Sequence, residues 1–139
     1  MPMKRKEIDR FLSEPNIAVI AVTAPDGHPH AIPTWYDYQA GVVTIHSDTT
    51  AFKYKCLQKN PYVTLCVDTR TAPYKAVILK GRVTLEVKED YKRFERMAIS
   101  YLGKKQGFAY AKTLKGNKVG VITFRPEKII SWDYARDPI

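Results

Sequence analysis

The alternation of hydrophobic and polar residues divides the chain into short helices and extended strands. In residues 4–14, Ile8, Phe11 and Leu12 are spaced as on one face of a helix, and Pro15 ends the segment. Residues 51–59 and 89–102 show the same periodicity, the latter ending at Gly103, and a shorter helix is predicted over 107–114. The pattern therefore predicts four helices.

Extended segments make up most of the remaining chain. β-Branched and aromatic residues predict seven strands, at 16–23, 28–38, 42–46, 62–68, 74–87, 118–124 and 128–134. The turn signals at 25–27 and 39–41 join the first three strands in an antiparallel meander, which is typical of a small barrel or sandwich. Gly81 marks a bulge or a close approach of the backbone.

Composition indicates one folded domain over residues 1–139, because 45% of the residues are hydrophobic. The net charge of +9 would attract nucleic acid, an anionic membrane or a phosphorylated ligand. Cys56 and Cys66 are not spaced like zinc ligands or a redox pair, which predicts free thiols. The charged N-terminus and the lack of a long apolar run predict a cytoplasmic protein that does not enter a membrane.

The segment 28–38 is unusual for a strand. Pro29 and Pro33 each remove a backbone donor, which restricts the segment to a sheet edge or a barrel rim. Its free backbone groups, beside histidine, threonine and aromatic side chains, could hold a flat polar heterocycle. Alternatively, it is a twisted edge strand with Trp35 in the core. No third or fourth ligand accompanies the two histidines, so no metal site is predicted.

Residues 47–59 suggest an anion site at the start of a helix. The capping side chains of 47–50 precede the helix, and Lys53 and Lys55 lie in its first turns, where the helix dipole disfavours cations. Phosphate would explain them. Residues 53 and 55 are about 200° apart on a helix, so both reach one phosphate only if one lies in the preceding loop. Two lysines on a solvated helix face are the alternative.

Other chemistries find less support in the chain. There is no Gly-x-Ser-x-Gly motif, no glycine-rich nucleotide loop and no cysteine with an evident histidine partner, so covalent catalysis is not predicted. Basic and aromatic residues between Tyr62 and Arg82 would suit single-stranded nucleic acid. Basic residues are nevertheless spread over the whole chain, which makes nucleic-acid binding the weaker alternative.

Three segments together resemble a known family. Residues 28–37 (HPHAIPTWYD), 47–65 (SDTTAFKYKCLQKNPYVTL) and 74–85 (YKAVILKGRVTL) are similar to the FMN-binding split-barrel family related to pyridoxamine 5′-phosphate oxidase. They most resemble its short branch, which includes enzymes that use the deazaflavin coenzyme F420. The resemblance implies a mainly β fold with flanking helices, a six-stranded antiparallel split β-barrel of Greek-key-like order. It also implies a homodimer with cofactor sites at the subunit interface.

The same resemblance assigns cofactor-binding residues. Five would lie against the flavin-type ring: Ala31, Ile32, Pro33, Thr34 and Trp35. Three would contact the ring edge or the ribityl chain, Ser47, Asp48 and Thr49, and two the phosphate, Lys53 and Lys55. Four more would come from the partner subunit or the same pocket wall, or would cover the cofactor: Tyr74, Lys75, Lys80 and Trp132.

The expected function is hydride transfer between the bound cofactor and a small conjugated substrate. The chain lacks the extended C-terminal substrate region of the parent oxidase, which argues against oxidation of pyridoxamine phosphate. Coenzyme F420 is slightly favoured over FMN, because its acidic tail suits a protein of charge +9. No residue is singled out as catalytic. The alternatives are a non-catalytic flavin or haem carrier on the same barrel and a binder of single-stranded nucleic acid.

Overall fold

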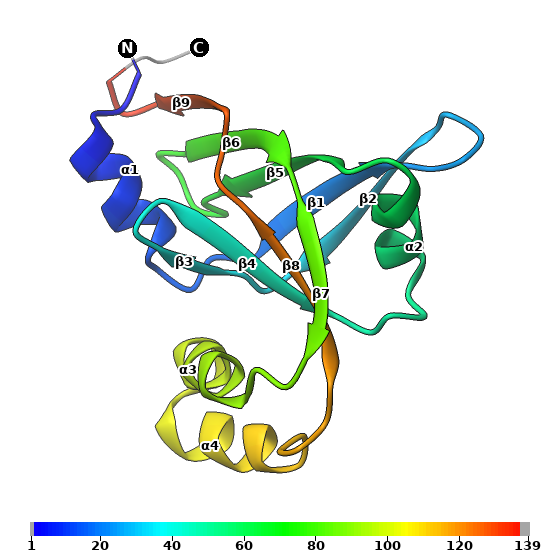
Figure 1. Cartoon of the computed structure of the whole chain (residues 1–139). Coiled ribbons are helices and arrows are strands. Elements are labelled where there is room, and N and C mark those ends of the chain that lie inside the picture. Colours follow the sequence, from blue (N-terminus) through cyan, green and yellow to red (C-terminus); the bar gives the residue numbers. More distant parts are fainter. Residues whose placement is uncertain (1, 137–139) are drawn as a thin grey trace.

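The computed structural model describes residues 2–136, which form two antiparallel β-sheets and four helices (Figure 1). Residue 1 and residues 137–139 of the predicted domain lie outside the described residues. One sheet has five strands in the order β2-β1-β5-β6-β9: Ala18–Thr23 (β1), Pro29–Thr34 (β2), Tyr62–Asp68 (β5), Lys75–Arg82 (β6) and Lys128–Asp133 (β9). The other has the order β3-β4-β8-β7: Asp37–Gln39 (β3), Val42–Ser47 (β4), Thr84–Lys88 (β7) and Val119–Phe124 (β8).

Two segments predicted as single strands are divided between the sheets. Residues 28–38 form β2 and β3, and residues 74–87 form β6 and β7, so the described chain has nine strands rather than seven. Each segment turns a corner at a buried residue, Tyr36 in one and Val83 in the other. The mainly β fold with flanking helices is confirmed, and the two shared segments join its sheets around one core.

The core lies between the inner faces of the two sheets. Alternate residues of the central strands point inward and are fully buried, among them Ile20, Leu65 and Leu79. Helix α1 (Arg5–Leu12) adds Ile8, Phe11 and Leu12 to this core, as their spacing predicted. At Gly81 the added Cβ of any other residue would lie 3.0 Å from the Phe124 ring, which confirms the predicted close approach.

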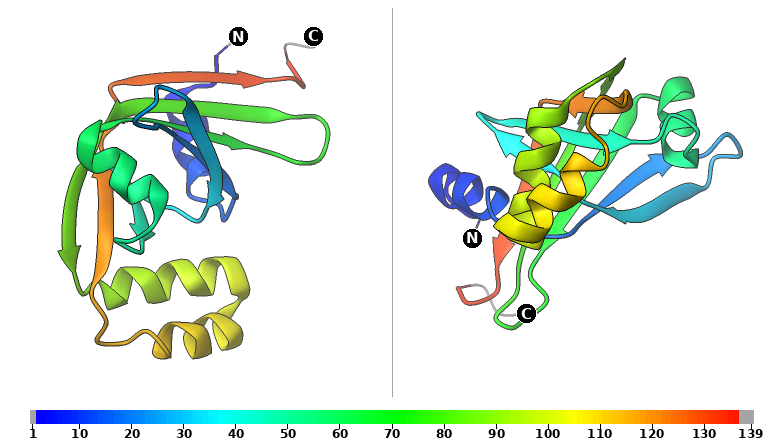
Figure 2. Two further views of the ribbon diagram at one scale, coloured as in Figure 1. Left: turned by 90° about the vertical axis from the view of Figure 1, so that its right-hand side faces the viewer. Right: turned by 90° about the horizontal axis from the view of Figure 1, so that it is seen from below.

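The other helices lie on different sides of the sheets (Figure 2). Helix α2 (Phe52–Lys59) follows β4, whereas α3 (Tyr91–Leu102) and α4 (Lys104–Lys112) form a hairpin beside the four-stranded sheet. Gly103 joins the two helices with a φ of 89°, so α3 ends where predicted. Helix α4 begins three residues earlier than the predicted residue 107, because Gly103 both ends one helix and starts the next.

In residues 2–136, no helix has both the length and the apolar character needed to cross a membrane. Within the same residues, no cluster of three histidine, cysteine or acidic side chains could hold a metal ion. Cys56 is buried and Cys66 half-buried, and both are free thiols.

Candidate functional site

The first turn of α2 contains one partly buried lysine. Lys53 is half-buried, and this turn has no acidic residue. Burial lowers the pKa of its ammonium group, an effect that nearby Asp48 partly opposes. The backbone N–H groups of Phe52 and Lys53 donate no hydrogen bond within residues 2–136. A partly buried ammonium group and two free amides thus belong to the first turn of one helix, at its positive end, a combination that suits an anion.

The loop before α2 leaves these amides free. Oδ1 of Asp48 accepts hydrogen bonds from the amide (3.0 Å) and hydroxyl (2.9 Å) of Thr50, and the Ser47 hydroxyl donates to the Asp48 carbonyl (2.9 Å). The helix begins after Ala51, and no side chain caps it. The prediction that residues 47–50 cap this helix was therefore wrong, because Asp48 and Ser47 stabilise the loop itself.

β2 is an edge strand, as its prolines predicted. The Ala24 amide donates to the His28 carbonyl (2.9 Å), so even-numbered residues of β2 direct their backbone groups toward β1. Pro29, Ala31 and Pro33 direct theirs to the free edge. This edge presents three carbonyl groups and the N–H of Ala31, and these groups could bind the polar rim of a heterocycle. Because the two prolines provide no N–H, the edge is poorly suited to pairing with another strand.

One face of β2 lies against the first residue of α2. The His30 and Phe52 rings are in edge contact, with centroids 4.9 Å apart. Because Phe52 is next to Lys53, the residues predicted to bind the ring and one lysine predicted to bind the phosphate lie on adjoining elements.

Trp35 follows β2 and packs against helix α3 rather than in the core between the two sheets. Its ring is half-buried and stacks on Tyr101 with centroids 4.8 Å apart and planes nearly parallel at 1°. The Tyr101 hydroxyl donates to the Asn16 carbonyl (2.7 Å), and burial raises the pKa of this phenol to about 12. Trp35 therefore has a fixed orientation beside the strand predicted to hold the ring.

The remaining predicted residues do not gather at this place within one chain. Lys55 is exposed and, like Lys53, lies inside α2, so the two side chains leave the helix about 200° apart. Lys75 and Lys80 lie on opposite faces of β6, about 17 Å apart along the strand. Tyr74 precedes β6 and is exposed, whereas Trp132 lies opposite Ala76 on β9, and its buried indole N–H has no partner within residues 2–136.

A polar network that the sequence did not reveal links β4 to α3. Nε2 of His46 lies 2.8 Å from Oδ2 of Asp90, which also binds Arg93, and Arg93 extends the network to Asp37. The His46 side chain is only 7% exposed. Asp90 is at the N-cap position of α3, yet its carboxylate makes no cap bond and binds His46 instead. The two residues are 44 positions apart, so no local pattern signals their pairing.

The same network borders a cavity of about 490 Å³ between the end of β4 and the α3–α4 hairpin. Predicted residues Ser47, Asp48 and Thr49 line it together with His46. A second cavity, of about 190 Å³, shares His46 and includes the predicted residues Thr34 and Trp35. Five of the predicted cofactor residues therefore line one or the other of two cavities that share His46 as a lining residue.

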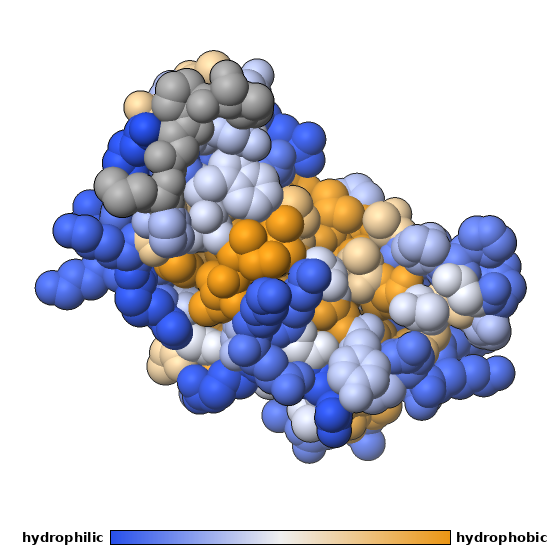
Figure 3. Space-filling model, turned by 90° about the horizontal axis from the view of Figure 1, so that it is seen from above, coloured by the Kyte–Doolittle hydropathy of each residue, from blue (hydrophilic) through white to orange (hydrophobic). Residues whose placement is uncertain are grey.

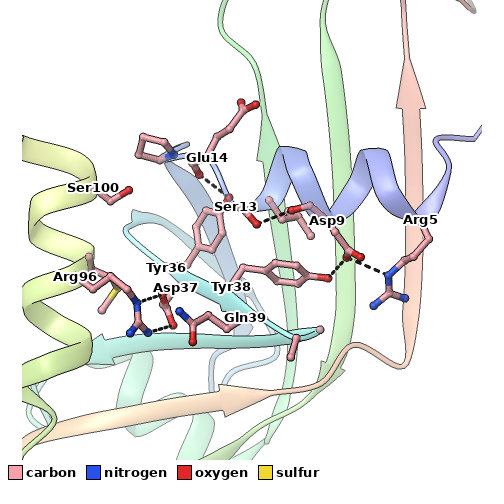
Figure 4. A pocket seen from close by; sticks show the side chains of 15 residues that line it. Arg5, Asp9, Ser13, Glu14, Tyr36, Asp37, Tyr38, Gln39, Arg96 and Ser100 are labelled. Atoms are coloured by element: carbon pink, nitrogen blue, oxygen red, sulfur yellow. Dashed lines mark hydrogen bonds and ion pairs between the residues drawn. The ribbon is translucent and has the colours of Figure 1, made fainter.

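A cavity of about 560 Å³ beside α1, β3 and α3 is a poorer candidate (Figure 4). Most of its polar side chains bind one another: Arg96 donates to Asp37 (3.0 Å), and the Tyr38 hydroxyl donates to Asp9 (2.6 Å), which is also paired with Arg5. None of the predicted cofactor residues lines it. Its polar groups thus serve to join α1, β3 and α3.

We expect the free energy of unfolding to fall as the pH is lowered through about 6.5. Burial lowers the pKa of His46 from its ordinary 6.5. The nearby Asp90 carboxylate partly opposes this decrease, and the Arg93 guanidinium adds to it. The unfolded chain then binds a proton at a higher pH than the folded one, which reduces stability by at most about 1.4 kcal/mol per pH unit. Urea unfolding from about pH 7.5 to about pH 5 measures this slope.

The variant His46→Phe is the control for this slope. It keeps a flat ring against Phe94 and removes the titrating group, so its stability should vary less over the same range. Carboxylates such as Asp90, whose pKa lies below the ordinary 3.8, lose their stabilising bonds only at lower pH. Equal slopes in the two proteins would contradict the assignment to His46.

Comparisons with known proteins identify the fold. No curated protein matches the sequence. A conserved hypothetical protein, Rv2991, from Mycobacterium tuberculosis has the same fold, with a TM-score of 0.77 and 21% identity over 99% of this chain and 89% of its own. An F420 reductase has a TM-score of 0.69 and 21% identity over 87% of this chain and 94% of its own. A FAD-binding protein (mll6688) from Mesorhizobium loti has a TM-score of 0.67 and 18% identity over 94% and 93%.

One protein family matches the sequence over nearly the whole chain. The profile described as pyridoxamine 5′-phosphate oxidase matches residues 5–133, which include both sheets, α2 and the α3–α4 hairpin. The chain therefore belongs to the pyridoxamine 5′-phosphate oxidase family.

Proposed function

We propose that this protein is an oxidoreductase that binds a phosphate-bearing flavin or deazaflavin and transfers a hydride between it and a small conjugated substrate. The observation that carries the proposal is the start of α2, where Lys53 is partly buried beside two free amides in a chain of this family. A partly buried cation without an ion pair in residues 2–136 favours an anionic ligand. The similar proteins described as an F420 reductase and a FAD-binding protein support the cofactor class.

The residues around α2 form three groups, one for each part of such a cofactor. Lys53, with Lys55 as a second candidate, and the free amides would hold the phosphate. Ser47, Asp48 and Thr49 would lie along the ribityl chain, and the 31–35 segment against the ring. When bound, the cofactor supplies the hydride chemistry, and the protein positions it and shapes the substrate site. The charge of +9 favours F420 over FMN, because F420 adds an acidic tail.

We further propose a homodimer built on the outer face of the five-stranded sheet, with the two sheets as the halves of a split barrel. The strand register aligns one row of residues across all five strands: Pro33, Val19, Cys66, Ile78 and Ile130. Figure 3, which looks down on the molecule from above Figure 1, shows hydrophobic residues gathered in the middle of this side with hydrophilic ones around them. An uncovered apolar face of a sheet supports association with a second copy.

The dimer would also account for the predicted residues that lie apart within one chain. The next row on the same face runs from Ala31 to Lys80 through Ala21 and Thr64, so the proposed interface borders the free edge of β2. Through this interface, the second subunit's 74–80 segment and Trp132 could reach a cofactor held at β2 and α2.

Replacing Ile78 by glutamate tests this interface. Ile78 is half-buried in the middle of the row, and a charge in the centre of a dimer interface costs several kcal/mol, so we expect a monomer. Thr84→Glu, at an exposed position on β7 of the other sheet, should leave the dimer intact. Sedimentation equilibrium measures both. If Ile78→Glu stays dimeric and folded, the interface lies elsewhere.

Turnover distinguishes the enzyme from a cofactor carrier on the same fold. The protein is loaded with reduced cofactor without oxygen, and conjugated carbonyl and nitro compounds are added in turn. The proposal predicts that at least one reoxidises the cofactor faster with the protein than without it. A protein that binds the cofactor and accelerates none of these reactions would be a carrier.

A further inference from the structure

We propose that the cavity between β4 and the α3–α4 hairpin binds a neutral, planar aromatic ligand with an O–H or N–H group, and that Nδ1 of His46 accepts this hydrogen bond. The identification of this ligand as the substrate rests on the function proposed above. The binding itself rests on the contacts of His46 and on the walls of the cavity.

Asp90 determines which nitrogen of His46 carries the proton. Nε2 lies 2.8 Å from Oδ2 of Asp90, and an ionised carboxylate accepts hydrogen bonds only, so Nε2 carries the hydrogen. Arg93 binds the same carboxylate and keeps it ionised. In the neutral ring Nδ1 then has a lone pair, and it is buried without a partner in residues 2–136. A buried acceptor of this kind calls for a ligand with a donor.

The walls of the cavity favour an aromatic ring. The His46 and Phe94 rings stack with their centroids 5.8 Å apart and an angle of 20° between their planes. The centroids of the Phe94 and Tyr110 rings are 5.7 Å apart. Leu114 and Val119 add aliphatic surface to the same wall. The volume of about 490 Å³ lies in the range typical of sites for small molecules. Ring stacking and apolar burial would supply affinity, and Nδ1 would set the orientation.

The charges around His46 favour a neutral ligand. The negative charge of Asp90 is balanced by Arg93 within the network, and the neutral imidazole adds none. Asp48 and Lys118 also line the cavity, but both are exposed and they carry opposite charges. Among the less exposed lining residues that the structure describes, the one charged side chain, Asp90, is already paired, so a phenol, an aromatic alcohol or a lactam fits better than a carboxylate.

The cavity adjoins the proposed cofactor site, because Ser47, Asp48 and Thr49 are among its lining residues. The smaller cavity of about 190 Å³ shares His46 and Phe94 with the larger one and is also lined by Thr34 and Trp35, two residues predicted to lie against the ring. A ligand bound to Nδ1 would therefore lie near the segment that holds the cofactor. His46 would act as a positioning residue, since it orients the ligand by one hydrogen bond.

Phenol and toluene test the proposal, because they have the same shape and only phenol has a donor. The probes are titrated into the wild-type protein, and the ¹⁵N resonances of the imidazoles are recorded. We expect phenol to shift the Nδ1 resonance of His46 upfield and to bind about threefold or more tightly than toluene. Without the hydrogen bond, the more hydrophobic toluene would bind better. Equal binding, or no shift of Nδ1, would overturn the proposal.

Two variants separate the hydrogen bond from general effects. His46→Phe should lose the preference for phenol, whereas His28→Phe, at a turn residue that is 82% exposed in its side chain, should keep it. A preference that survives in folded His46→Phe would also overturn the proposal. Titration of the same samples with FMN and F420 tests the proposed function separately. If phenol binds as expected and neither cofactor binds, the ligand site stands, and its assignment to the substrate fails with the proposed function.

Discussion

Replacing Lys53 by alanine is expected to weaken binding of a phosphate-bearing flavin cofactor by about 10- to 150-fold. A charged hydrogen bond from a partly buried ammonium group contributes about 1.5 to 3 kcal/mol, which corresponds to this range. Nothing else in the first turn of α2 can replace it, because this turn has no other basic residue that is equally buried. Fluorescence titration with FMN and F420 at constant ionic strength measures the loss.

Two further lysines of the same helix provide controls. Lys59→Ala removes the same charge from the exposed last turn of α2 and should change the affinity by about twofold or less. Lys55→Ala tests the second predicted phosphate contact and should cost less than Lys53→Ala, because Lys55 is exposed. If Lys59→Ala weakens binding as strongly as Lys53→Ala, the effect is one of net charge, and the phosphate lies elsewhere.

Replacing Gly107 by alanine is expected to destabilise the protein by about 1 to 3 kcal/mol or more. A Cβ at this position would lie 2.4 Å from Cα of Ile99 and 2.5 Å from the carbonyl oxygen of Ala98. Both are backbone atoms of α3, so the clash is relieved only if the two helices of the hairpin move apart. Urea unfolding measures the loss of stability, and the changed spacing should also reduce phenol binding in the adjoining cavity.

Gln106→Ala is the matched control. It introduces the same residue one position earlier in α4, where the side chain is exposed, and should change the stability by no more than about 0.5 kcal/mol. Alanine favours helices more than glycine does by about 1 kcal/mol, so a loss in Gly107→Ala arises against the intrinsic preference. Equal stability of the two variants would mean that the helices do not pack as closely as the structure has them.

The local elements follow closely from the sequence, whereas the sheet partition and the His46 site do not. The prolines of β2 predict its edge position because a missing N–H is a local property of the chain. The corners at Tyr36 and Val83 interrupt segments of unbroken strand character, and only the packing of both sheets on one core determines where the chain turns.

The same distinction applies to the site. The pattern at 47–59 predicts an anion site at the start of α2, which remains a proposal. It does not separate Lys53 from Lys55, since their different burial depends on elements that pack against the helix. Asp90 looks like an ordinary helix-start acid, and its pairing with His46 is a tertiary contact. Residues whose role depends on distant partners are therefore those that sequence patterns miss.

Titration of the purified wild-type protein with FMN and with F420 tests the central claim most directly. The account predicts saturable binding of at least one of them at micromolar concentration, one cofactor per subunit, with a change in the absorption of the bound ring. F420 should bind more tightly if its acidic tail uses the positive charge of the protein. Absence of binding by both cofactors at these concentrations would contradict the account, and salt-sensitive retention of a single-stranded oligonucleotide would then favour the nucleic-acid alternative.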